Sequence, residues 1–200
     1  ALTKTKESYT LLKELILAEP PLVEYMYPLQ SVISDSLQLT KILFPELMRL
    51  SSDSLFADFI ADLANQLLDS SYITVASIKP FEKNLLLTCE SIIEKLKADP
   101  EADVYSYDES LHLLGRLNSA EGNKLLQKIV LLKQKNLNRI IITDLLLNKQ
   151  TVPKEMIEFQ AADKEYRFSF YYRLQENGLT AFFPSKYSTQ KSIAESDVYN

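Results

Sequence analysis

Residues 118–147, NSAEGNKLLQKIVLLKQKNLNRIIITDLLL, decide the fold class of this chain. Apolar residues recur three or four positions apart along this stretch, which predicts an amphipathic helix rather than a strand. Asn118 followed by Glu121 has the spacing of a capping box and predicts where the helix begins. The β-branched run 140–142 also allows a break or a short strand. We therefore predict either one long helix to about Leu147 or a helix interrupted near residue 140.

The same helical period recurs in four earlier stretches, near residues 9–16, 28–44, 56–67 and 85–96. Prolines separate most of these stretches, and a helix usually ends before a proline. Asp53 and Ser106 are placed to cap helices that follow them. We expect a shared helical core that includes Phe59, Ile60, Leu63, Ile92, Ile93 and Ile129.

The C-terminal third shows a different pattern. Between residues 166 and 174, aromatic or apolar residues alternate with polar ones, and Asn177-Gly178 follows as a typical two-residue hairpin turn. We therefore predict a mainly α fold: an irregular helical bundle with a C-terminal β-hairpin. The predicted organisation is a helical domain over 1–150, a hairpin over 151–184 packed on the helices, and a flexible tail over 185–200.

Composition excludes many enzyme classes. The chain has 200 residues, of which three are glycine, one is cysteine and one is histidine. Phosphate-binding loops need closely spaced glycines, and most zinc and iron sites need several cysteines or histidines. No stretch approaches the roughly 20 apolar residues of a membrane span. We expect no cofactor, no metal site and no transmembrane segment.

Three weaker chemical patterns have simpler structural explanations. Glu109 and His112 have the E-x-x-H spacing of di-iron bundles, but the chain has no second histidine to complete such a site. Asp58 and Asp62 lie four residues apart, yet two carboxylates alone make a poor Mg²⁺ site. Cys89 lies on a predicted apolar helix face, where cysteine usually acts as a small hydrophobe. We therefore predict no catalytic residues and no enzymatic activity.

Charge supplies the best indication of function. The net charge is −5, but residues 121–150 hold six basic residues against two acidic ones. On a continuous helix, four of the six fall on one side. The outer face of the predicted hairpin adds two arginines and a tyrosine. The predicted partner-binding residues are Lys124, Lys128, Lys135, Arg139, Arg167, Tyr171 and Arg173.

These features favour a non-catalytic cytoplasmic protein that binds another protein, as an adaptor, assembly subunit or regulator. The basic side chains suit a partner with an acidic surface, and self-association stays open. The alternative is a helical regulatory domain that binds a small molecule in an apolar pocket. Binding of nucleic acid or phosphate through the basic stripe is disfavoured, because the overall charge is negative and the chain lacks the glycines of common RNA-binding motifs.

Overall fold

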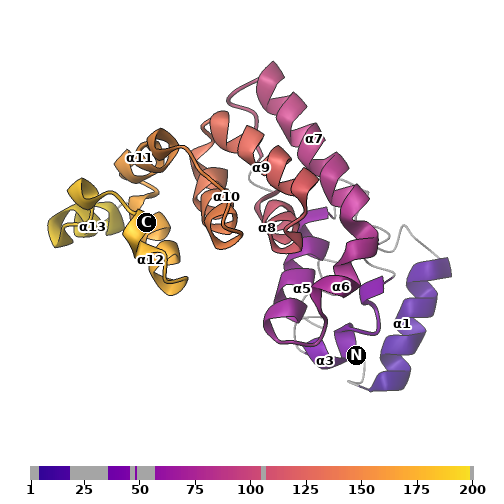
Figure 1. The fold of residues 1–200 in the computed structure, drawn as a ribbon. Helices are drawn as coiled ribbons and strands as arrows, with labels where there is room; N and C mark the ends of the chain where they lie inside the picture. Colours follow the sequence, from indigo (N-terminus) through magenta and orange to yellow (C-terminus); the bar gives the residue numbers. More distant parts are fainter. Residues whose placement is uncertain (1–4, 19–35, 46–47, 49–56, 105–106, 199–200) are drawn as a thin grey trace. The chain divides into compact units, whose positions relative to one another are not determined.

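The part of the chain that the structure describes is helical and contains no strand (Figure 1). The structure is a computed structural model, and it describes residues 5–18, 36–45, 48, 57–104 and 107–198. The chain divides into two compact units, residues 1–85 and 86–200. The division falls inside helix α7 (Glu82–Ala98), whereas the sequence predicted a boundary after residue 150. The mainly helical character predicted from the sequence is confirmed.

The first unit contains short and medium helices. They are α1 (Lys6–Ala18), α3 (Leu37–Thr40), α5 (Ala57–Asp69), α6 (Val75–Ile78) and η2 (Lys79–Phe81), followed by the start of α7. Helix α3 packs against both α1 and α5. Ile60 and Leu63 are buried, as predicted for α5, and so is Tyr9 of α1. The side chains of Asp53 and Phe59 lie outside the described residues.

The second unit is built from consecutive helices that pack in pairs. After α7 come α8 (Asp108–Leu117), α9 (Ala120–Leu131), α10 (Lys135–Leu147), α11 (Lys154–Ala162), α12 (Arg167–Glu176), η4 (Thr180–Phe182), η5 (Ser185–Tyr187) and α13 (Gln190–Asp197). Each helix from α8 to α13 packs against the next, and α10 also packs against α8 and α12. Helices α8, α10 and α12 therefore form a row of neighbours.

The stretch 118–147 forms two helices, and the break lies earlier than residue 140. Lys133 adopts a left-handed backbone conformation with φ of 61°, which ends α9 before α10 begins. The predicted N-cap is also displaced by one residue. Asn118 is the left-handed C-cap of α8, while Ser119 caps α9 by accepting a hydrogen bond from the amide of Gly122. Ser106, the other predicted cap in this unit, lies outside the described residues.

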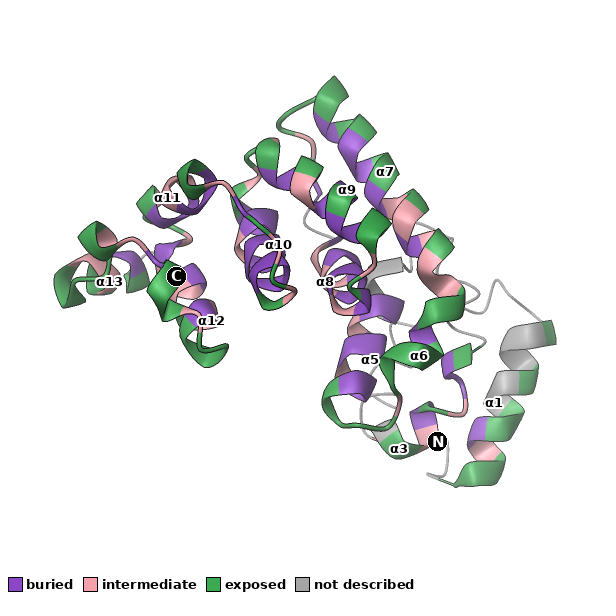
Figure 2. Ribbon diagram, viewed as in Figure 1, coloured by how far each residue is buried: buried purple, intermediate pink, exposed green. Residues whose placement is uncertain are grey.

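Helix α10 is buried along most of its length (Figure 2). Burial extends over residues 136–138 and 140–146, so almost every side of the helix contacts protein. A helix that is surrounded in this way gains more from packing than it loses from the low helix propensity of isoleucine. The β-branched run 140–142 is therefore helical, although its local preference is for a strand.

The predicted β-hairpin is wrong, because residues 167–176 form helix α12. Arg167, Phe170 and Leu174 are buried at positions i, i+3 and i+7, which is a helical spacing. The Asn177-Gly178 pair ends this helix. Gly178 has φ of 69°, and its amide donates a hydrogen bond to the carbonyl of Gln175. The amide of Leu179 donates a second one to the carbonyl of Leu174. This pair of hydrogen bonds is a Schellman motif, which needs the same positive φ as a hairpin turn.

The C-terminal residues also differ from the expected loose tail. Where the sequence predicts a flexible segment over 185–200, the structure has η5 and α13. Thr189 caps α13 by accepting a hydrogen bond from the amide of Ser192. The buried hydroxyl of Ser196 bonds to the amide of Phe168 and to the carbonyl of Lys164, so it joins α13 to α12.

We predict that Gly178→Val lowers the free energy of unfolding by about 1–2 kcal/mol, because a β-branched residue is strained at positive φ. No atom lies within 4 Å of the position that a Cβ would take, so the loss would come from the backbone alone. Gly178→Asn should cost less, since asparagine tolerates this conformation. Urea unfolding measures both, and equal losses for the two variants would contradict the assignment of this cap.

Candidate functional site

Three charged or titratable side chains meet within the row α8, α10 and α12. The carboxylate of Asp144 on α10 is buried, with 3% of its side chain exposed. Its Oδ2 lies 2.8 Å from Nδ1 of His112 on α8, and its Oδ1 lies 3.8 Å from Nη2 of Arg173 on α12. Each helix in the row thus contributes one member of the cluster His112–Asp144–Arg173.

The tautomer of His112 follows from its contact with Asp144 when that carboxylate is ionised. An ionised carboxylate only accepts hydrogen bonds, so the 2.8 Å contact needs a proton on Nδ1. The Nη2 of Arg173 is also a donor and lies 3.3 Å from the same nitrogen, so that contact is not a second hydrogen bond. In the neutral ring, Nε2 is then an acceptor, and the side chain is 23% exposed.

The cluster lacks the other parts of a catalytic site. An Asp–His pair of this orientation activates a nucleophile in hydrolases, yet within the described residues no hydroxyl or thiol bonds to Nε2 of His112. Burial, with a smaller contribution from the charge of Glu90, raises the pKa of Cys89 to about 12, so its thiol stays protonated at neutral pH. The described residues hold no group of three potential metal ligands. The cluster is best explained as a link between helices.

Gly115 allows α8 and α10 to approach at this cluster. A Cβ at position 115 would lie 2.7 Å from the Cβ of Asp144, closer than packed atoms allow. The carbonyl of Gly115 accepts a hydrogen bond from the side chain of Asn148, at the end of α10. Asn148 also bonds to Asn123 of α9, which bonds in turn to Asn118. Polar side chains therefore tie together the ends of three helices.

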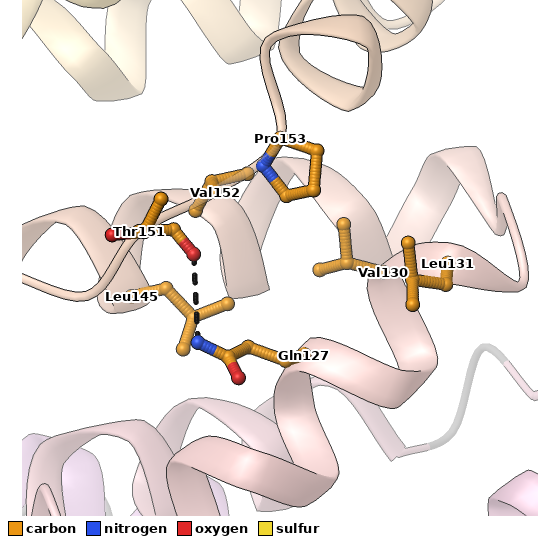
Figure 3. A pocket seen from close by; sticks show the side chains of 7 residues that line it. All are labelled: Gln127, Val130, Leu131, Leu145, Thr151, Val152 and Pro153. Atoms are coloured by element: carbon orange, nitrogen blue, oxygen red, sulfur yellow. Dashed lines mark hydrogen bonds between the residues drawn. The ribbon is translucent and has the colours of Figure 1, made fainter.

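An apolar pocket of about 180 Å³ lies between α9, α10 and the segment 151–153 (Figure 3). Among the described helices, α9 and α11 do not pack closely on each other. The pocket lies beside the segment 151–153, which precedes α11. The side-chain amide of Gln127 bonds to the carbonyl of Thr151 across it. We call this the α9–α10 pocket; it is lined by Gln127, Val130, Leu131, Leu145, Thr151, Val152 and Pro153.

Four lysines lie close in the sequence to residues that line the α9–α10 pocket. Lys124 and Lys128 are exposed on α9 at helical spacing from Leu131, which is itself 57% exposed. Lys149 and Lys154 are exposed on either side of the segment 151–153. None of these four lysines forms an ion pair with a described residue. Their ammonium groups are therefore available to a ligand.

The other predicted binding residues are placed differently. Lys135 and Arg139 lie on α10, so they do not continue the α9 row, and they pair with Asp163 and Asp108. Arg167 is buried and donates four hydrogen bonds, to the carbonyls of residues 161, 162 and 192 and to the Ser192 hydroxyl. Tyr171 packs edge-on against Phe183 at 5.0 Å, and Arg173 belongs to the cluster described above.

The Lys135–Asp163 pair shifts the pKa of both partners. Its hydrogen bond to Asp163 raises the pKa of Lys135 above the usual value of 10.5. Burial alone would raise the pKa of Asp163, but hydrogen bonds from Lys135 and from the amides of Tyr166 and Glu165 outweigh burial and lower it. The pair therefore connects α10 to the turn between α11 and α12, and it is charged over a wide range of pH.

The lysines of α9 remain predicted partner-binding residues, whereas neither the position of the pocket nor the cluster was predicted from the sequence. Asp144 stands among leucines and isoleucines, and an acid within an apolar helix face is itself a signal of a buried partner. Comparison with known protein families, curated proteins and solved structures gives no match. Among the described residues, no helix is both long and apolar enough to cross a membrane.

We predict that Gly115→Ala destabilises the protein by about 2 kcal/mol, because the added methyl group forces α8 and α10 apart. Gly122→Ala is the comparison variant: its Cβ would lie 2.9 Å from Cδ1 of Leu114 and from Oγ of Ser119, which are the ends of two side chains, and both variants gain helix propensity. Urea unfolding should show the larger loss for Gly115→Ala. Wild-type stability for this variant would show that the close approach at Asp144 is unimportant.

We also predict a pH-dependent effect of Asp163→Asn, which removes the charge but keeps an acceptor for the amides. Asp163 stabilises the fold above its usual pKa of 3.8, and this contribution is lost as pH falls through its lower folded pKa. The contribution of Lys135 is present below 10.5 and is lost as pH rises through its higher folded pKa. The variant should therefore lose at most about 1 kcal/mol near neutral pH, and less at both extremes.

Chemical unfolding from acidic through neutral to alkaline pH measures the difference in the free energy of unfolding between the variant and the wild type. Asp197→Asn is the control, since Asp197 is exposed and has no partner among the described residues. A loss of stability that does not vary with pH would contradict a charge-based link.

Proposed function

We propose that this protein binds, without catalysing a reaction, an acidic amphipathic segment of another protein. The observation that carries the proposal is the α9–α10 pocket, an apolar hollow whose lining residues lie close in the sequence to exposed lysines with no ion-pair partner among the described residues. One part of the partner would bury an apolar side chain there, and its acidic residues would face the lysines.

The size and lining of the pocket favour a peptide over nucleic acid. A cavity near 150 Å³ holds a group the size of benzene, so the α9–α10 pocket, at about 180 Å³, suits one leucine or phenylalanine side chain. None of its seven lining residues is aromatic, whereas proteins that bind single-stranded nucleic acid stack bases on aromatic rings. Leu131 extends the apolar surface beyond the pocket.

Selection from a displayed library of random 12-residue peptides tests the proposal. The selected peptides should combine a leucine or phenylalanine with several aspartates or glutamates. Raising the salt concentration should lower the affinity of these peptides for the protein. Lys128→Glu should reduce their affinity about tenfold. Lys164→Glu is the matched control, because Lys164 is exposed like Lys128 but lies between α11 and α12, more than ten residues from any residue that lines the pocket.

Three results would contradict the proposal. They are selected peptides without an excess of acidic residues, equal losses of affinity for Lys164→Glu and Lys128→Glu, and displacement of the peptides by polyuridylic acid at equal concentration. The last result would assign the lysines to phosphate binding instead.

A further inference from the structure

We propose that the first unit binds a small aromatic carboxylate in a second pocket, independent of the α9–α10 pocket. This cavity of about 410 Å³ falls within the 300–1,000 Å³ that is usual for small-molecule sites. It is formed by two segments of the chain, residues 41–45 and 72–81. We call it the aromatic pocket; its lining is Lys41, Ile42, Phe44, Pro45, Tyr72, Ile73, Ser77 and Phe81.

Aromatic rings dominate the walls of this pocket. Phe44 and Phe81 pack edge to face, with ring centroids 6.3 Å apart, and so hold the two segments together. Tyr72 adds a third ring and is 41% exposed. Rings in these orientations favour a planar aromatic ligand, which can stack on one ring and meet the edge of another.

The charge at the pocket selects an anion. Lys41 is the charged residue of the lining, and it has no ion-pair partner among the described residues. Glu82, which follows the lining residue Phe81, already pairs with Lys79. The Tyr72 hydroxyl has no hydrogen bond to a described residue and offers a further donor. An ammonium group and a hydroxyl beside an apolar hollow are complementary to a carboxylate on an aromatic ring.

Backbone hydrogen bonds hold both segments in place before a ligand arrives. The amides of Ile42 and Leu43 bond to the carbonyls of Leu39 and Thr40. On the other side, Ser71 has a left-handed φ of 58°, and the amide of Tyr72 bonds to the carbonyl of Leu67. A pocket with fixed walls loses little conformational entropy on binding.

Titration with 2-naphthoate and its neutral analogue 2-naphthamide, followed by ligand-observed NMR and calorimetry, tests the inference. A ligand of this size should bind with a Kd of about 0.1–1 mM. The carboxylate should bind about fivefold more tightly than the amide, because only the carboxylate pairs with Lys41. Lys41→Gln should abolish this preference, and Tyr72→Ala should weaken both compounds.

Lys83→Gln is the matched control, since Lys83 is exposed nearby in the sequence but does not line the pocket. Both lysine substitutions are at exposed positions, and far-UV circular dichroism checks that each variant is folded. The inference is overturned if naphthoate shows no saturable binding, if the wild type does not distinguish acid from amide, or if Tyr72→Ala leaves both affinities unchanged. Equal effects of Lys41→Gln and Lys83→Gln would also overturn it, because they would indicate general charge attraction.

Discussion

The second unit depends on the burial of α10, whose residues contact neighbouring helices on almost every side. Burial on this scale removes water from the polar groups that the helix carries, so a group without a partner costs free energy. The Oδ1 of Asn138 is buried without a hydrogen-bond partner among the described residues. The side chain of Asn138 donates to the carbonyl of Val130 at the end of α9, and Asp144 meets His112 and Arg173. These polar contacts define which helices can surround α10, and hence the order of the row α8, α10 and α12.

Periodicity predicted α7 well but misassigned α12. The spacing of Leu85, Cys89, Ile92, Ile93 and Leu96 predicted α7, and all five are buried. Periodicity could not predict the ends of α8, α9 and α12, because a left-handed residue follows each of them. Lys133 ends α9 with a conformation that glycine usually provides, so the sequence shows no break there. Asn177-Gly178 was misread for a related reason: hairpin turns and helix C-caps both need positive φ.

The candidate site was predictable in its charge but not in its shape. The excess of lysine in residues 121–150 is visible in the composition, whereas the α9–α10 pocket is lined by residues of α9, α10 and the segment 151–153. Residues so far apart in the chain meet only in the tertiary structure, so no short stretch encodes the pocket. The alternation in 166–174 predicted that Arg167 lies on the outer face of a hairpin. In the structure its guanidinium instead bonds to carbonyls at the end of α11.

The arginines of the second unit differ in their contacts from the four lysines that lie near the α9–α10 pocket in the sequence, which bears on how a partner would be recognised. Arg139, Arg167 and Arg173 all bond or pair inside the unit, where a planar guanidinium can bridge several acceptors. The lysines around the α9–α10 pocket are exposed instead, and each is a flexible, strongly hydrated point charge. Under the proposed function, such charges would attract an acidic segment without fixing the position of each carboxylate. Specificity would then come from the apolar side chain in the pocket, while the lysines would govern the rate of association and its sensitivity to salt.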